Sequence, residues 1–201
     1  MAKAFTESNK EDIRTALLNK GREYFIKYGY KKTSVDEIVK AVGIAKGSFY
    51  KFFDSKEALF MAIHEESETN LQIAMMQKLE KIIDPSEKLR MFFQNAFHLL
   101  ETDPLLRAVL TRDDFESLSG FMTSDKYREH YRNDIAFLEE LIKKWQEEGV
   151  IRKLDATVAS NMIAAAYYII IQKESFNENM YKSVIDMLVD SLVHYLKADG
   201  R

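Results

Sequence analysis

Two short helical patterns separated by one glycine lie between residues 33 and 55. In the first pattern, apolar side chains recur at the spacing of one helix face: Val35, Ile38, Val39 and Val42. Gly43 follows, and glycine readily adopts the left-handed backbone that ends a helix. A second short helix is expected from about residue 45 to residue 53. This stretch is therefore expected to fold as two short helices joined by a tight turn.

A longer helix is expected before this pair. It begins at Ser8 or Asn9, because both side chains cap helix N-termini, and it runs to Tyr28, where Gly29 stops it. Three helices in this order, with a tight turn between the last two, match the helix-turn-helix motif. In that motif the second helix of the pair lies in the major groove of DNA.

The remainder of the chain also reads as helical. Only 2 prolines and 7 glycines punctuate 201 residues, which favours an all-α protein over one built from strands and turns. With the first three helices this makes about nine, the later ones expected over about 55–84, 86–102, from 103, 124–148, 155–174 and 177–197. We expect two domains, an N-terminal three-helix domain over residues 1–54 and a larger helical domain over residues 55–201.

The third helix has two different faces. Phe49 and Phe53 can face the core, which leaves Lys46, Gly47, Tyr50 and Lys51 on the opposite side. Lysines and a tyrosine hydroxyl can contact phosphates or base edges, and a glycine lets the helix backbone approach DNA closely. Two helices joined at a glycine are more often ordinary packing than a DNA reader, so this pattern alone does not establish DNA binding.

Charge divides the chain in the same place. Residues 1–60 carry 12 Lys and Arg against 8 Asp and Glu, a net charge of +4. The remaining residues carry 17 against 24, a net charge of -7. The first third is therefore the part of the chain suited to a polyanion such as DNA.

The wider pattern "TSVDEIVKAVGIAKGSFYKFFDSKEALF" resembles the DNA-binding domain of the TetR family of bacterial transcription regulators. The resemblance is specific over about residues 8–65. It implies that DNA is approached by residues matching Thr33, Lys46, Gly47, Ser48, Tyr50 and Lys56. With their neighbours, the expected DNA-binding set is Thr33, Ser34, Lys46, Gly47, Ser48, Tyr50, Lys51 and Lys56.

Two positions depart from the pattern of the family. Ala45 stands where a capping Ser or Thr is frequent, and Phe52 stands where His or Tyr is common. The third helix is thus expected to be less firmly capped and to have one phosphate contact fewer. These changes bear on affinity for DNA rather than on the fold.

The last two expected helices have more apolar surface than one core can cover. A monomer would leave one apolar stripe of each helix in water, so we expect a homodimer with two-fold symmetry. The resemblance implies a four-helix interface of this kind and a palindromic operator. The expected interface residues are Val158, Ala165, Tyr168, Val184, Leu188, Leu192 and Tyr195.

The middle helices are rich in aromatic side chains and methionine. Most of these side chains are expected in the core, but the resemblance implies a cavity for a small-molecule effector, and this lining would suit a mostly apolar one. The candidate pocket residues are Phe93, Phe97, His98, Tyr127, Tyr131, Trp145, Met162 and Tyr167.

Catalysis and membrane insertion find little support. The chain has no cysteine, its four histidines show no metal-binding spacing, and no nucleophile or phosphate-loop motif occurs, so we expect no catalytic site, metal or cofactor. The longest apolar run, residues 162–171, is far shorter than the roughly 20 residues of a spanning helix. The start "MAKAFTESNK" lacks the apolar segment of a signal peptide, which indicates a cytoplasmic protein.

The sequence thus predicts a ligand-responsive, dimeric DNA-binding regulator, and the family resemblance favours a repressor. The alternative is a helical small-molecule-binding protein with little specific affinity for DNA, which the departures at Ala45 and Phe52 keep open. Binding to a promoter fragment separates the two. An enzyme is a distant third reading.

Overall fold

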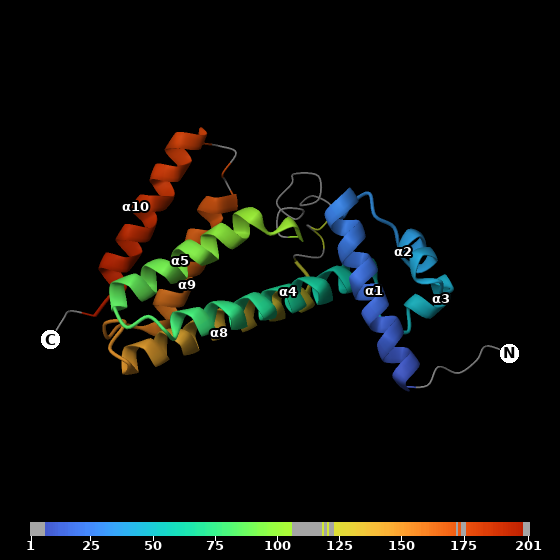
Figure 1. Ribbon diagram of the computed structural model, residues 1–201, viewed down its shortest axis with the longest axis horizontal. Coiled ribbons are helices and arrows are strands. Elements are labelled where there is room, and N and C mark those ends of the chain that lie inside the picture. The colour runs from blue at the N-terminus through green and yellow to red at the C-terminus, as the bar shows by residue number, and fades with distance from the viewer. Residues whose placement is uncertain are drawn as a thin grey trace. The chain divides into compact units, whose positions relative to one another are not determined.

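The computed structural model describes residues 7–105, 118, 120, 123–171, 173 and 176–198, and these residues form an all-α protein (Figure 1). Its named helices are α1 (Glu7–Tyr28), α2 (Val35–Val42), α3 (Lys46–Phe49), α4 (Lys56–Leu79), α5 (Pro85–Thr102), α8 (Asp125–Glu147), α9 (Ala156–Ile171) and α10 (Glu178–Leu196). The expected fold class is confirmed, and the eight helices of the described residues are close to the expected nine.

The chain divides into two compact units. The first comprises residues 1–71 with 103–122, and the second comprises residues 72–102 with 123–201. Helix α4 therefore contributes its first part to one unit and its last part to the other. The first unit extends past residue 54, where we expected the domain boundary, because α1 packs closely on the first half of α4.

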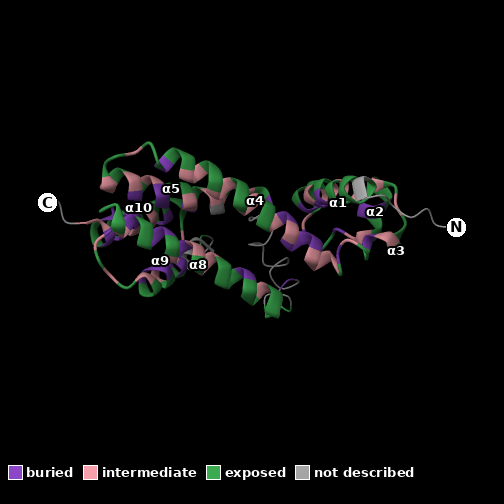
Figure 2. Cartoon of the chain, turned by 90° about the horizontal axis from the view of Figure 1, so that it is seen from below, coloured by how far each residue is buried: buried purple, intermediate pink, exposed green. Residues whose placement is uncertain are grey.

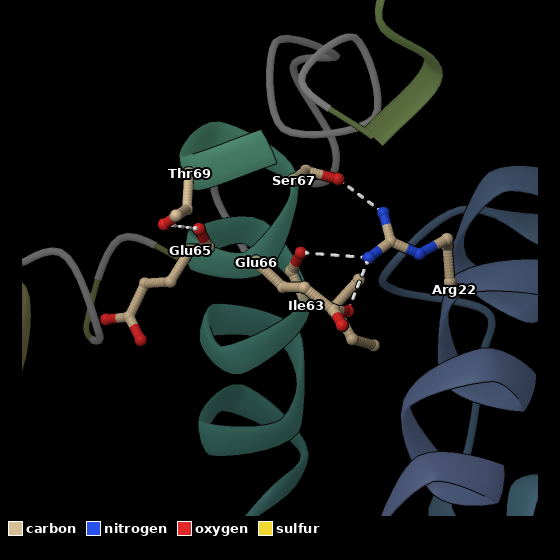
Figure 3. A network of polar contacts seen from close by, with 6 residues as sticks. All are labelled: Arg22, Ile63, Glu65, Glu66, Ser67 and Thr69. Atoms are coloured by element: carbon tan, nitrogen blue, oxygen red, sulfur yellow. Dashed lines mark hydrogen bonds and ion pairs between the residues drawn. The ribbon is translucent and has the colours of Figure 1, made fainter. Parts of the chain in front are cut away.

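Two neighbouring residues of α1 make this packing close. A Cβ atom on Gly21 would lie 2.8 Å from Cδ1 of Ile63 and 3.0 Å from Cδ2 of Leu59, so a larger residue here would force these side chains to shift. Beside it, the Arg22 guanidinium donates hydrogen bonds to α4, as Figure 3 shows. Its acceptors are the Ser67 hydroxyl, the Ile63 carbonyl and the Glu66 carboxylate.

The second unit has one apolar core, formed by the end of α4 with α5, α8, α9 and α10. Buried and exposed residues alternate along these helices, as expected of helices that each turn one side inward (Figure 2). The bulky buried side chains come from every one of the five: Leu79, Leu89, Phe92, Phe93, Phe97, Leu138, Leu141, Ile142, Trp145, Ile163, Val189, Leu192, Val193 and Leu196. After α8, Ile151 pairs with Lys197 in an isolated β-bridge, which ties this turn to the end of α10.

Three of the later helices start where the sequence predicts, each with a side-chain cap. Ser55, Ser124 and Asn177 accept hydrogen bonds from the backbone N–H groups of Ala58, Tyr127 and Met180. Helix α4 ends at Leu79, earlier than the expected residue 84. Asp84 instead caps α5, because its carboxylate accepts a hydrogen bond of 2.7 Å from the backbone N–H of Glu87.

Helix α3 is shorter than expected, with four residues in place of about nine. Ala45 precedes it and offers no side-chain cap, as its methyl group dictates. After Phe49, Lys51 N–H donates to the Ser48 carbonyl and Phe52 N–H to the Phe49 carbonyl at the tighter three-residue spacing, and Phe53 N–H also donates to the Phe49 carbonyl. The recognition element is therefore one helical turn followed by a tighter turn.

In the described residues, no helix is both long enough and apolar enough to cross a lipid bilayer.

Gly43 provides a test of the turn between α2 and α3. Its φ of 80° lies in the left-handed region, and the backbone N–H groups of Gly43 and Ile44 both donate to the Val39 carbonyl. Replacing Gly43 by Ala should lower the free energy of unfolding by about 1 kcal/mol, because a Cβ atom is strained at this φ. Urea denaturation followed by circular dichroism measures the loss.

Gly43→Asn should lose less, since Asn tolerates this conformation better. Gly47→Ala is the matched control, because Gly47 has no positive φ and an added Cβ would contact nothing. Equal stability of Gly43→Ala and Gly47→Ala would contradict the proposed constraint.

Candidate nucleic-acid interface

Helix α2 begins with a capping box. The Ser34 hydroxyl oxygen accepts a hydrogen bond from the Glu37 backbone N–H, and the Glu37 carboxylate accepts one of 2.9 Å from the Ser34 backbone N–H. The hydrogen bonds from the Ser34 hydroxyl and backbone hold the pKa of Glu37 below its ordinary value. Ser34 is therefore the N-cap of α2.

The short helix α3 presents the face expected from its sequence. Phe49 is fully buried and Phe53 nearly so, with their rings 5.9 Å apart between centroids. The outward residues of this turn are Lys46, Gly47, Tyr50 and Lys51, all exposed to solvent, and Ser48 is half-buried beside them. Burial of the two phenylalanines thus holds a one-turn helix in place with its polar side outward.

Lys46 already has a partner on this face. Its ammonium nitrogen lies 2.7 Å from the Asp36 carboxylate of α2, and both side chains are exposed. The hydrogen bond to Asp36, and then the attraction of its charge, raise the pKa of Lys46. The two helices of the motif are therefore connected on their solvent side by an ion pair.

Thr33 and Lys56, both expected to approach DNA, are engaged inside the unit. Thr33 is 2% exposed, and its hydroxyl lies 2.8 Å from the Gly29 carbonyl and 3.1 Å from the Tyr24 carbonyl, to which it donates. Lys56 donates hydrogen bonds of 2.9 Å to the carbonyls of Tyr30 and Thr33. These side chains hold the segment between α1 and α2 in position, a supporting role that the sequence reading did not include.

Tyr30 is the residue of this support that sequence reasoning missed. Its ring packs against Phe25 and Phe60, and the Lys56 ammonium lies 4.1 Å from the ring centroid. Its hydroxyl donates a hydrogen bond of 2.6 Å to Glu57. Burial alone would raise the pKa of Glu57, but this bond and further hydrogen bonds lower it below its ordinary value. The aromatic segment "YGYKK" and the later Lys-Glu pair were the available signals.

The expected dimer residues of α9 and α10 lie mostly at the surface. Val158 is 67% exposed and Tyr195 is 56% exposed, Ala165 is exposed, and Val184 and Leu188 are half-buried. A hollow of about 390 Å³ lies between the two helices, lined by Met162, Ala165, Ala166, Leu188, Ser191, Leu192 and Tyr195.

Two interface residues need separate comment. Leu192 is buried in the apolar core and also lines the hollow, so its place in a dimer interface stays a prediction. The side chain of Tyr168 lies outside the described residues.

The candidate effector residues do not converge on one site. Phe93, Phe97 and Trp145 are buried in the core cluster, where Trp145 packs edge-on against Phe92 with centroids 5.3 Å apart. His98 and Tyr131 are exposed and Tyr127 is half-buried. Met162 borders the hollow between α9 and α10, and the Tyr167 side chain lies outside the described residues. Core packing, the commoner role of aromatic residues, accounts for the first three.

A second hollow in this unit has a volume of about 270 Å³. Trp145, Leu79 and Met76 form its apolar lining, and its rim is charged, with Glu80, Lys88, Lys144 and Glu148.

Comparison with known proteins gives one family. The model of the bacterial regulatory proteins of the tetR family matches residues 17–63. The HTH-type transcriptional repressor DhaR of Mycobacterium sp. (strain GP1) is 32% identical over 142 residues, which cover 70% of this chain and 71% of the relative.

Solved structures share the fold. A TetR-family transcriptional regulator from Pectobacterium atrosepticum is similar with a TM-score of 0.76 and 21% identity, over 98% of this chain and 100% of the other. The regulator FadR from Bacillus subtilis in complex with stearoyl-CoA has a TM-score of 0.57 and 22% identity, over 90% and 95% of the two chains.

Lys56 gives a test of the supporting contacts. Lys56→Met keeps most of the length of the side chain but leaves the carbonyls of Tyr30 and Thr33 without their charged donor. It should lower the free energy of unfolding by about 2 kcal/mol in the absence of DNA. Lys46→Met, which breaks only an exposed ion pair, should cost less than about 1 kcal/mol. Thermal and urea unfolding measure the stability loss of each variant. A larger loss for Lys46→Met than for Lys56→Met would refute this role for Lys56.

Proposed function

Because the chain belongs to the TetR family of bacterial DNA-binding regulators, we propose that it is a repressor that binds a palindromic operator as a homodimer. A small molecule releases it from the operator. The observation that carries the DNA-binding part is the outward set of Lys46, Gly47, Tyr50 and Lys51 on a turn anchored by buried Phe49. Repression is supported by the similarity to DhaR, a transcriptional repressor. We propose that the protein acts in the cytoplasm and not as an enzyme.

In this proposal each outward residue has a distinct role. Lys46, at the start of α3, reaches base edges, because an ammonium group can donate to the O6 and N7 atoms of guanine. Lys51 and the Tyr50 hydroxyl contact phosphates, which fix the position of the protein on the duplex. Gly47 allows the backbone of α3 to come close, since its surroundings are open. Ser48, Ser34, Thr33 and Lys56 complete or support this surface.

Variants of α3 test the proposed roles. Lys46→Ala should cost about 1–3 kcal/mol on a duplex selected by the wild-type protein and should change which duplex is preferred. Tyr50→Phe removes only a hydroxyl, so it should weaken binding to all duplexes by a similar factor. Fluorescence anisotropy with labelled duplexes measures both effects.

Lys143→Ala is the matched control, because Lys143 is also an exposed lysine paired with a carboxylate, that of Glu140, but lies in the other unit. Unchanged affinity of Lys46→Ala and Tyr50→Phe in folded protein would exclude α3 as the reading element.

We infer that the homodimer forms through α9 and α10. Both helices present apolar residues to solvent around an apolar hollow, including Val158, Met187 and Tyr195. Such a surface is uncommon on a monomer. Two-fold symmetry would place the same stripe of each copy against its counterpart, and a dimer would place two α3 turns on the two halves of a palindrome.

Val158→Glu tests the dimer without disturbing the protomer core. Val158 is largely exposed, so a folded protomer tolerates the charge, whereas a dimer would bury it unpaired at a cost of several kcal/mol. Analytical ultracentrifugation should therefore show monomers with native circular dichroism. Lys182→Glu, on the polar side of α10, is the control and should remain dimeric. A dimer of Val158→Glu with wild-type affinity would place the interface elsewhere.

We propose that the effector is mostly apolar. The core of the second unit is rich in phenylalanine and methionine, and the FadR structure of similar fold holds stearoyl-CoA, an acyl thioester. The candidate contacts are Tyr127, Tyr131, His98 and Tyr167. Phe93, Phe97 and Trp145 would contact such a ligand only after rearrangement of the core in which they are packed.

A further inference from the structure

The ion pair between Asp36 and Lys46 joins the two helices of the motif on the side that faces solvent. The carboxylate oxygen lies 2.7 Å from the ammonium nitrogen, and the side chains are 66% and 51% exposed. Both side chains are exposed, so water and an approaching polyanion can reach both charges. An acidic residue in this position is unexpected on a surface that binds DNA, because it repels phosphates.

The second acidic residue of α2 has a structural explanation. Glu37 accepts hydrogen bonds from the backbone N–H and hydroxyl of Ser34 and completes the capping box. Asp36 is not part of that box. Its carboxylate instead accepts a hydrogen bond from Lys46, the lysine to which we assign base contacts, and that pairing raises the pKa of Lys46. Asp36 therefore acts directly on the charge available for DNA.

A lysine that is already paired with a carboxylate contributes less to the free energy of DNA binding than a free lysine. A lysine that contacts a phosphate releases a counterion from DNA, and this release drives most sequence-independent binding. If the lysine must first leave a carboxylate, a phosphate only replaces one anionic acceptor by another. A guanine edge in the major groove adds two acceptors in a fixed geometry, which only a matching sequence supplies.

We propose that Asp36 is a specificity-determining residue, which neutralises Lys46 in the free protein so that DNA lacking a suitable base acceptor is bound weakly. The inference rests on the proposed DNA-binding function of α3. Asp36 does not contact the bases in this scheme. Asp36 lowers the affinity for every DNA sequence, and it lowers the affinity most for sequences that lack a base acceptor for Lys46.

The test uses the full chain and two duplexes. One is recovered by selection with the wild-type protein from a random library, and the other is a scrambled duplex of the same composition. Asp36→Asn should steepen the dependence of log affinity on log salt for the scrambled duplex by about 0.9. With 1 M salt as the reference, this slope corresponds at 0.1 M salt to a gain of about eightfold for the scrambled duplex, and the gain for the selected duplex should be smaller.

Glu23→Gln is the matched control. Glu23 forms an exposed ion pair of the same length, 2.7 Å, with Lys20, also within the first unit, but on α1. It removes the same charge and frees a lysine outside the proposed reading face. When Lys46 is already replaced by Ala, adding Asp36→Asn should raise the affinity for DNA by no more than Glu23→Gln raises it in the wild-type protein. The reason is that Asp36 acts on DNA binding through Lys46.

The outcomes are distinguishable. If the wild-type protein selects no duplex, the proposed DNA-binding function itself fails. If it does, and Asp36→Asn changes both duplexes by the same factor as Glu23→Gln, the inference about Asp36 is wrong and only net charge matters. A loss of affinity for the selected duplex on Asp36→Asn would also overturn it, because Asp36 would then contact a base directly. Unchanged thermal unfolding shows that the variants compare folded proteins.

Discussion

The contact between Lys56 and the segment after α1 holds the first unit together. One ammonium group donates to the carbonyls of Tyr30 and Thr33 and lies over the Tyr30 ring, so it fixes the chain between α1 and α2 to the start of α4. The Thr33 hydroxyl and the Tyr30 hydroxyl secure the same segment from within. Because α2 follows directly, the placement of the helix-turn-helix depends on this group of bonds.

The outward face of α3 depends on that placement because α3 has little stability of its own. A single turn without a side-chain cap is too short to be stable in isolation. It persists because Phe49 and Phe53 are buried beneath it and Gly43 sets its direction. The residues proposed to contact DNA are thus presented by packing rather than by helix propensity. Asp36 and Lys46 add one bond on the solvent side.

Local signals predicted the helices well and the roles of single side chains less well. Glycines marked the ends of α1, α2 and α8, and all three have positive φ, because the left-handed conformation is a property of the residue itself. The apolar spacing likewise identified which face of α3 is buried. The roles of Thr33 and Lys56 were less accessible, since their partners are backbone carbonyls brought near by folding. Leu192 shows the same limit. The apolar periodicity predicts which side of α10 it lies on, but only the packing of the folded chain shows that it is buried in the core.

The length of α3 has a consequence for how much sequence the protein can distinguish. Four residues advance about 6 Å along a helix axis, and successive base pairs are about 3.4 Å apart. One turn therefore spans about two base pairs, which is far too little information to identify one site in a genome. In the proposed dimer, the same element would be used twice, at a fixed separation. The spacing between the two half-sites would then be part of what the protein recognises, together with the bases that each α3 contacts.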